Sequence, residues 1–277
     1  MGLLKVSKVV DILKGMRVIE GSAFVAVPLA GLTLAQMGAE VIRFDRLEGG
    51  LDSNRWPVNN TGQSFFWAGL NKGKKSIAID MRSSRGRELI TQLIAAEGQD
   101  SGIFITNLRV KGWLDYKTLS QVRKDLIMVT LKGDRKGRPQ VDYTVNPALG
   151  IPSITGPEGA EDPVAHALPA WDCIAGNLMV SSLLAAERQR FRDGIGQDVE
   201  LSLKDVAAAI TGHLGMIGEA TINTSERGKS GNALYGAFGN DFRCADGRRV
   251  MVIGLTARQW SGLVKATNTQ DKMAEIE

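Results

Sequence analysis

The sequence predicts an α/β fold with a large, Rossmann-like parallel-sheet domain and the start of a smaller second domain. Up to residue 201, short apolar runs alternate with helical patterns, which is typical of β–α–β units and a parallel sheet. After residue 224 the chain becomes rich in Gly and charge, and two apolar runs around Asp246-Gly247 then predict a β-hairpin. We therefore expect a large domain over residues 1–224, and a linker with the beginning of a small domain over residues 225–277.

Each expected element follows from a local pattern. Ile174, Leu178, Met179, Leu183 and Ala186 recur at helical spacing and predict a long helix. The Pro- and Gly-rich stretch 142–170 predicts a long irregular connection. The expected strands are residues 17–19, 41–44, 76–79, 102–106, 126–131 and 197–201, with a hairpin over 238–244 and 249–254. The expected helices are residues 28–37, 84–96, 119–124, 174–190 and 204–222.

Composition narrows the class of protein. Hydrophobic residues make up 43% of the chain, and no apolar run approaches the roughly 20 residues that span a bilayer. The first ten residues lack the long apolar segment of a secretion signal, and Cys173 and Cys244 are too few for a disulfide framework, so we expect a cytoplasmic protein without a membrane partner. His166 and His213 are too few and too far apart to predict a metal site.

Basic residues gather where the predicted strands end or turn. Open α/β sheets bind ligands at such positions, and a net charge of +4 with a pI near 9.1 suits a polyphosphate. No basic helix or basic run interleaved with aromatics supports nucleic acid. The residues concerned are Arg43, Arg46, Lys72, Lys74 and Lys75. The alternative to ligand binding, for each of these residues, is an ordinary solvated charge on the surface.

Three ordered blocks carry a family resemblance. They are Gly15-Met-Arg-Val-Ile-Glu20, Leu34-Ala-Gln-Met-Gly-Ala-Glu-Val-Ile-Arg-Phe-Asp45 and Leu70-Asn-Lys-Gly-Lys-Lys-Ser-Ile-Ala-Ile-Asp80. In this order they resemble the class III (CaiB/BaiF) coenzyme A transferases. Further blocks, such as Arg55-Trp-Pro57 and Leu168-Pro-Ala-Trp-Asp172, are similar to the members that move CoA within one methylfumaryl diacid.

The resemblance implies a nucleophilic aspartate at Asp172. An aspartate at the start of a helix is usually only a cap, and both roles can hold at once. A carboxylate near a helix N-terminus favours its ionised form, which can attack a thioester. The resemblance also places Asn107, Arg109 and Lys132, together with the five basic residues above, near the CoA. The apolar turn at Phe24, Val25 and Ala26 stands where many members have a polar residue near the thioester.

The resemblance implies CoA transfer through an aspartyl-CoA intermediate, with acyl-CoA and a dicarboxylic acid as substrates. No tightly bound cofactor is expected, because CoA enters as part of the substrate. The expected reaction is C1-to-C4 transfer from 2-methylfumaryl-CoA to 3-methylfumaryl-CoA; intermolecular transfer to a free acid, or an inactive CoA-binding remnant, are the alternatives. Family members form interlocked homodimers and continue well past residue 277, so the small domain is expected to be incomplete.

Overall fold

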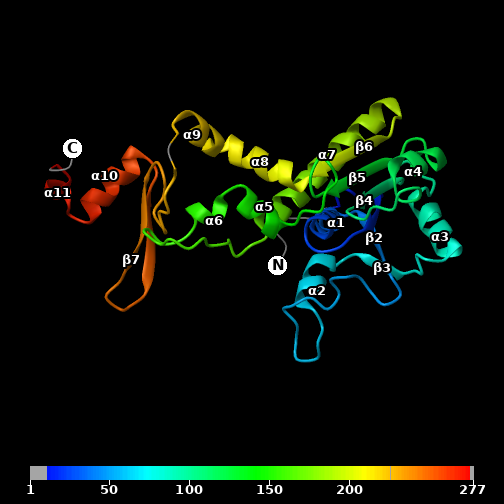
Figure 1. The fold of residues 1–277 in the computed structure, drawn as a ribbon, viewed down its shortest axis with the longest axis horizontal. Helices are drawn as coiled ribbons and strands as arrows, with labels where there is room; N and C mark the ends of the chain where they lie inside the picture. The colour runs from blue at the N-terminus through cyan, green and yellow to red at the C-terminus, as the bar shows by residue number, and fades with distance from the viewer. Residues whose placement is uncertain (1–10, 225, 275–277) are drawn as a thin grey trace. The chain divides into compact units, whose positions relative to one another are not determined.

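The computed structural model describes residues 11–224 and 226–274. Contacts between residues divide the chain into two compact units, residues 1–145 with 168–214, and residues 146–167 with 215–277 (Figure 1). The predicted boundary at residue 224 thus lies ten residues beyond the division at 214. Gly215, with φ of 80°, breaks the expected helix 204–222 into α8 (Leu203–His213) and α9 (Met216–Ile222). The expectation about a secretion signal concerns residues 1–10, which lie outside the described residues.

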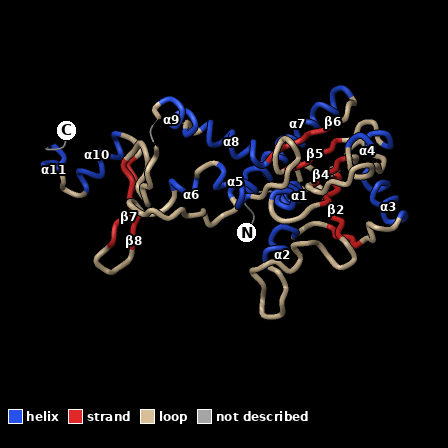
Figure 2. The backbone as a smooth tube through the Cα atoms, in the orientation of Figure 1, coloured by secondary structure: helices blue, strands red, loops and turns tan. Residues whose placement is uncertain are grey.

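A parallel sheet of six strands forms the centre of the first unit and confirms the predicted fold class (Figure 2). The order is β3-β2-β1-β4-β5-β6, and every neighbouring pair runs parallel. The order reverses between β1 and β4, as in a Rossmann sheet. The strands are β1 (Arg17–Gly21), β2 (Glu40–Asp45), β3 (Lys75–Ala78), β4 (Ile103–Thr106), β5 (Ile127–Lys132) and β6 (Gln197–Ser202).

Helices cover both faces of this sheet. On one face, Ile90 and Ile94 of α3 (Ser84–Ile94) and Leu119 of α4 (Tyr116–Val122) pack against strand residues such as Ile19 and Phe104. The other face holds α1 (Ala26–Gln36) and the long α7 (Ala170–Asp193). These two helices approach closely at Gly176, where a Cβ would lie 2.6 Å from the Ala26 carbonyl oxygen. A glycine is therefore required at this crossing.

Before residue 155, three short helices were not expected from the sequence. They are α2 (Phe65–Asn71), α5 (Asp142–Ala148) and α6 (Ile151–Ile154). Each spans two turns or fewer, so its periodicity cannot be separated from that of a loop. The last two lie in the connection that was predicted to be irregular. In α2, the Ser64 side chain accepts a hydrogen bond from the Trp67 N–H and caps the helix.

The second unit contains the predicted hairpin, with antiparallel β7 (Phe238–Arg243) and β8 (Arg249–Gly254). Phe238 lies 4.9 Å from the Trp260 ring of α10 (Ala257–Ala266), which joins hairpin and helix in a small apolar cluster. A short helix, α11 (Gln270–Ala274), follows. None of the described helices has the length and apolar character needed to cross a membrane.

Candidate functional site

The carboxyl ends of β1 and β4 form the topological switch point of the sheet, where open α/β proteins bind ligands. The β1–α1 turn crosses this point, and Asn107, just after β4, clamps it. The Asn107 Oδ1 accepts a hydrogen bond from the Ala23 N–H at 3.0 Å, and its Nδ2 donates to the Ala23 carbonyl oxygen at 2.9 Å. The predicted ligand-binding Asn107 therefore uses its amide to hold the turn.

Phe24 occupies the tip of this turn in a left-handed conformation, with φ of 70°. Such a conformation is costly for a residue with a Cβ and persists only where the surroundings impose it. Asp52 supplies one constraint, because its Oδ2 accepts the Phe24 N–H at 2.9 Å. Phe24 is 39% exposed, whereas Val25 and Ala26 are buried. Of the three residues expected near substrate, Phe24 is thus the one that presents its side chain to solvent.

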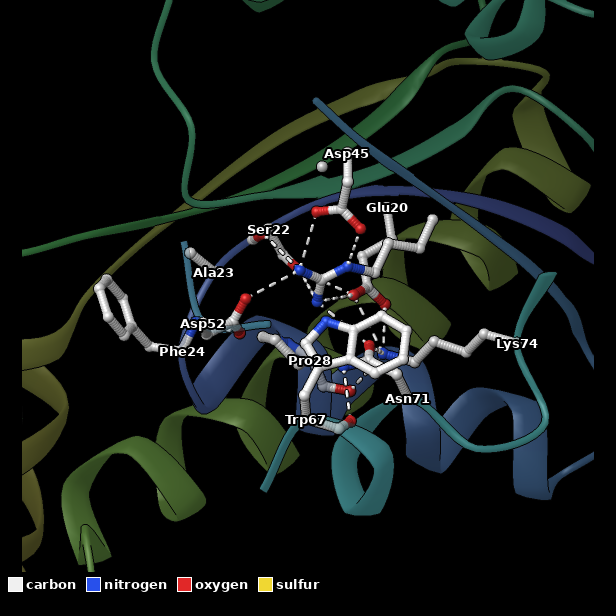
Figure 3. A network of polar contacts seen from close by, with 12 residues as sticks. Glu20, Ser22, Ala23, Phe24, Pro28, Asp45, Asp52, Trp67, Asn71 and Lys74 are labelled. Atoms are coloured by element: carbon white, nitrogen blue, oxygen red, sulfur yellow. Dashed lines mark hydrogen bonds and ion pairs between the residues drawn. The ribbon is translucent and has the colours of Figure 1, made fainter. Parts of the chain in front are cut away.

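A buried ionic network, centred on Arg43, supports the turn from below (Figure 3). The Arg43 guanidinium, 1% exposed, donates to both carboxylate oxygens of Asp45 at 2.8 and 3.0 Å and to Asp52 at 3.1 Å. It also donates to the Ser22 carbonyl oxygen at 3.2 Å. Arg43 therefore connects the end of β2 to the β1–α1 turn, while the Phe24 ring points away from the network (Figure 3).

Glu20 and Lys74 extend this network beneath α1. The Lys74 ammonium lies 2.8 Å from Glu20 Oε2 and donates to the Pro28 carbonyl oxygen at 2.8 Å. Burial raises the pKa of Glu20 and lowers that of Lys74, because burial disfavours both charges and the ion pair offsets this only in part. A Cβ at Gly31 would lie 1.8 Å from Glu20 Oε2, so the pair fits only beneath a glycine.

Arg43 and Lys74, which are predicted to bind CoA, form buried ion pairs in the structure. Their charges are buried and already matched by Glu20, Asp45 and Asp52. A ligand phosphate would have to displace these carboxylates. The sequence placed both cations correctly at strand ends and turns, yet it could not show which acidic residues surround them.

The other predicted cations lie at different places around the sheet. Arg46, Arg109 and Lys132 follow or end β2, β4 and β5 at the carboxyl edge, and Lys132 pairs with Glu200. Exposed Lys72 ends α2. Lys75 begins β3 at the opposite, amino edge, where it pairs with Glu40. The structure therefore does not bring Lys75 together with Arg46, Arg109 and Lys132.

An open cavity of about 620 Å³ adjoins the carboxyl ends of β2 and β3. Arg46 and Trp67 are among its lining residues. The buried Trp67 Nε1 has no hydrogen-bond partner among the described residues. Arg46 is therefore a predicted cation that lines a space large enough for part of a ligand.

Asp172 lies in the first turn of α7, as its third residue, and not before the helix as expected. The helix starts earlier because Asp142, 1% exposed, caps it from a distant segment. The Asp142 Oδ2 accepts the backbone N–H of Trp171 at 2.8 Å and of Asp172 at 3.2 Å. Since Asp142 takes the capping role, the Asp172 carboxylate is available for chemistry.

The surroundings of Asp172 raise its pKa to about 6, and burial is the largest cause. The charge of Asp142 raises the pKa further, while the charge of Arg55 lowers it. The helix N-terminus was expected to favour the ionised form, and burial opposes this effect. Above pH 6 the group is a partly desolvated carboxylate, which is a better nucleophile than a fully hydrated one.

Arg55 is a site residue that the sequence reasoning did not select. Its guanidinium lies over the rings of Phe24, at 5.5 Å, and Phe66, at 5.0 Å. Arg55 belongs to a sequence block used for the family resemblance, but no local pattern connects it with Phe24 or Asp172. The two rings lie far from Arg55 in sequence, so only the fold brings them to its guanidinium.

We expect Asp142→Asn to lower the pKa of Asp172, because it removes a nearby negative charge while the amide oxygen can still cap α7. The pKa should remain above the ordinary value of 3.8, since burial is the larger cause. A ¹³C-NMR titration of the Asp172 carboxyl, assigned with Asp172→Asn, measures it. Asp115→Asn is the matched control, because Asp115 caps α4 in the same way. An unchanged titration in Asp142→Asn would contradict this account.

Comparison with known proteins gives consistent matches. The profile described as CoA-transferase family III matches residues 13–276. The 2-methylfumaryl-CoA isomerase of Chloroflexus aurantiacus is 59% identical over 94% of this chain, and the succinate–glutarate CoA-transferase of Agrobacterium fabrum is 32% identical over 74%. The chain spans 64% and 54% of the length of these two relatives.

Solved structures show the same fold. A CaiB/BaiF family protein from Brucella suis matches with a TM-score of 0.76 at 24% identity, covering 92% of this chain and 69% of that one. A hypothetical protein from Mycobacterium tuberculosis matches with a TM-score of 0.71 at 22% identity, covering 91% and 67%. Among the described residues, no group of three or more His, Cys, Asp or Glu side chains could hold a metal ion.

Proposed function

The chain belongs to CoA-transferase family III, and we propose that it moves CoA from C1 to C4 of one diacid, converting 2-methylfumaryl-CoA to 3-methylfumaryl-CoA. The observation that carries this proposal is the half-buried Asp172 carboxylate in the first turn of α7, a helix that another residue caps. The 59% identity to a 2-methylfumaryl-CoA isomerase supports the choice of substrate.

The proposed reaction has four acyl-substitution steps, and Asp172 is the nucleophile in the first of them. Its carboxylate attacks the thioester carbonyl, and the CoA thiolate leaves, which forms a mixed anhydride. The thiolate then attacks the Asp172 carbonyl, giving an aspartyl-CoA thioester and the free diacid. The other carboxylate of the diacid attacks this thioester and expels the thiolate again. Attack of the thiolate on the new acyl carbon forms the product and restores Asp172.

The β1–α1 turn is placed to support the charged intermediates. The N–H groups of Ala23 and Phe24 are already bound to Asn107 and Asp52. An oxyanion would therefore use N–H groups further along the turn, at the start of α1. The buried network below keeps this backbone fixed, so little reorganisation accompanies the reaction.

We assign the CoA phosphates to cations at the carboxyl edge of the sheet. Arg46, which lines the cavity, together with Arg109 and Lys132, has the charge and position for this role. Exposed Lys72 remains a candidate for binding the CoA phosphates. Lys75 lies at the amino edge of the sheet, so a ligand would have to reach that edge to contact it. The proposed reaction uses no other cofactor.

An isotope experiment tests the proposed intramolecular transfer. The purified protein is incubated with unlabelled 2-methylfumaryl-CoA and ¹³C-labelled free mesaconate. We expect 3-methylfumaryl-CoA without label, because an acceptor held beside the aspartyl centre reacts at an effective molarity that can reach about 10⁵ M. Full entry of label into the product would indicate intermolecular transfer, as in the succinate–glutarate relative. Absence of product would contradict catalysis by this chain.

A further inference from the structure

Arg55 differs from the other arginine at the centre of this site. The Arg43 guanidinium is surrounded by carboxylates, whereas Arg55 makes no ion pair with any residue in the described part of the chain. Its side chain is exposed and its guanidinium lies over Phe24 and Phe66, which belong to the β1–α1 turn and α2. The structure thus holds an uncompensated cation against two aromatic rings.

Arg55 also lies within electrostatic reach of Asp172, because its positive charge lowers the pKa of that carboxyl. Helix geometry agrees with this placement. Gly176 of α7 packs against the Ala26 carbonyl, and Asp172 precedes Gly176 by one turn on the same helical face. Asp172 therefore faces the region of the β1–α1 turn, where Phe24 supports Arg55.

We propose that Arg55 binds the free carboxylate of a dicarboxylic acyl group attached to CoA, and so selects CoA esters of diacids over those of monoacids. This inference rests on the proposed function and adds a specificity residue to it. No bond forms or breaks at Arg55. Its guanidinium matches a carboxylate with two parallel hydrogen bonds.

The aromatic rings explain how a solvent-exposed arginine can serve this purpose. A free arginine side chain loses much rotamer freedom when it binds a ligand. Stacking on Phe24 and Phe66 restricts Arg55 beforehand, and rings on one side leave its N–H groups for a ligand. Phe24 is in turn fixed through Asp52 and Arg43, so the buried network reaches the carboxylate site through one backbone hydrogen bond.

This role fits a diacid that remains bound between two transfers. While one carboxyl group reacts at Asp172, the other needs a cationic partner nearby. After the diacid turns, the carboxylate released from the anhydride takes the same place on Arg55. A monoacid leaves Arg55 without a partner, so its ester gains nothing from the site.

The test compares two CoA esters that differ in one group. 2-Methylfumaryl-CoA carries a distal carboxylate, and tigloyl-CoA carries a methyl group in its place. Calorimetric Kd values are measured in an Asp172→Asn background, so that neither ester is turned over. We expect Arg55→Gln to weaken binding of the diacid ester about tenfold or more, the scale of one charge-assisted contact, and to leave tigloyl-CoA binding unchanged.

Two further variants separate charge from folding. Arg87→Gln is the matched control. Arg87 belongs to α3, away from the site, and its guanidinium lies 5.2 Å from the Trp113 ring, so both Kd values should stay as they were. Arg55→Lys should recover part of the lost affinity. Unchanged tigloyl-CoA binding also shows that Arg55→Gln is folded.

The outcomes separate this inference from the proposed function. If Arg55→Gln weakens the binding of both esters equally, or of neither, the proposed role of Arg55 is overturned. The proposed function is unaffected by that result, because the Asp172→Asn protein still binds CoA esters. Failure of the Asp172→Asn protein to bind either ester would instead overturn the proposed function, and the role of Arg55 with it. Selective loss of the diacid ester supports both.

Discussion

Asp172→Ala should lower CoA transfer by about 10³-fold or more, because it removes the group that carries the acyl and CoA intermediates. Binding of acyl-CoA should persist, since the cations at the carboxyl edge and the Arg43 network do not involve this side chain. Initial rates with 2-methylfumaryl-CoA, measured together with calorimetric binding, check both parts. Normal turnover by the Ala variant would exclude the nucleophile role.

Substitution of Asp172 should raise the stability of the folded protein, although it lowers activity. An acid whose pKa is higher in the folded chain favours folding below its unfolded pKa, and this contribution is lost as pH rises through the folded value of about 6. Asp172→Asn should therefore raise the free energy of unfolding at pH 8, by about 1 kcal/mol once solvent screening of this half-buried group is allowed for. Urea unfolding at pH 5 and pH 8 measures the difference.

Asp193→Asn provides the control on the same helix, because Asp193 ends α7 in an exposed position. It should change neither activity nor the pH dependence of stability. If Asp172→Asn, but not Asp193→Asn, gains stability and loses activity, this is typical of a functional residue that destabilises the folded protein. Equal stability of wild type and Asp172→Asn at both pH values would contradict the raised pKa.

The sheet could be predicted because its signals are local. The strands are short apolar runs bounded by charge or glycine, and the long helices carry their periodicity within a few turns, as in α7. The hairpin was visible for the same reason, since Asp246-Gly247 separates two apolar runs. A helix as short as α2 shows no clear periodicity in the sequence, and whether it forms depends on its packing against the rest of the fold.

The site could be predicted only in part because its contacts are distant in sequence. Asp172 is predicted from its motif, but the residue that caps its helix lies thirty positions earlier. Lys74 pairs with Glu20 across fifty-four positions, so the sequence showed a basic turn and could not show that this cation is neutralised. Arg55 was missed because its partners are brought together only by the fold.

Arg43→Ala should have the largest effect on stability, with a loss of about 3–5 kcal/mol in the free energy of unfolding. The reason is the burial of the carboxylates around it, since Asp45, Asp52 and Glu20 lie 2.8, 3.1 and 3.6 Å from its nitrogen atoms. Removal of the guanidinium leaves these charges without their main partner and releases the backbone that Asp52 holds at Phe24. Urea unfolding of the variant and wild type measures the loss.

The loss should depend on pH, and the sign follows from the acids left behind. Burial already raises the pKa of Glu20, and the charge of Arg43 opposes this effect. Without Arg43 the pKa of Glu20 rises further, so the variant loses stability as pH rises. The difference from wild type should therefore be larger at pH 8 than at pH 5.5. Arg46→Ala, at an exposed arginine nearby, should change stability by less than about 0.5 kcal/mol. If Arg43→Ala costs no more than Arg46→Ala, or the same at both pH values, the network does not hold the turn, and Phe24 must owe its strained conformation to Asn107 and the packing of α1 instead.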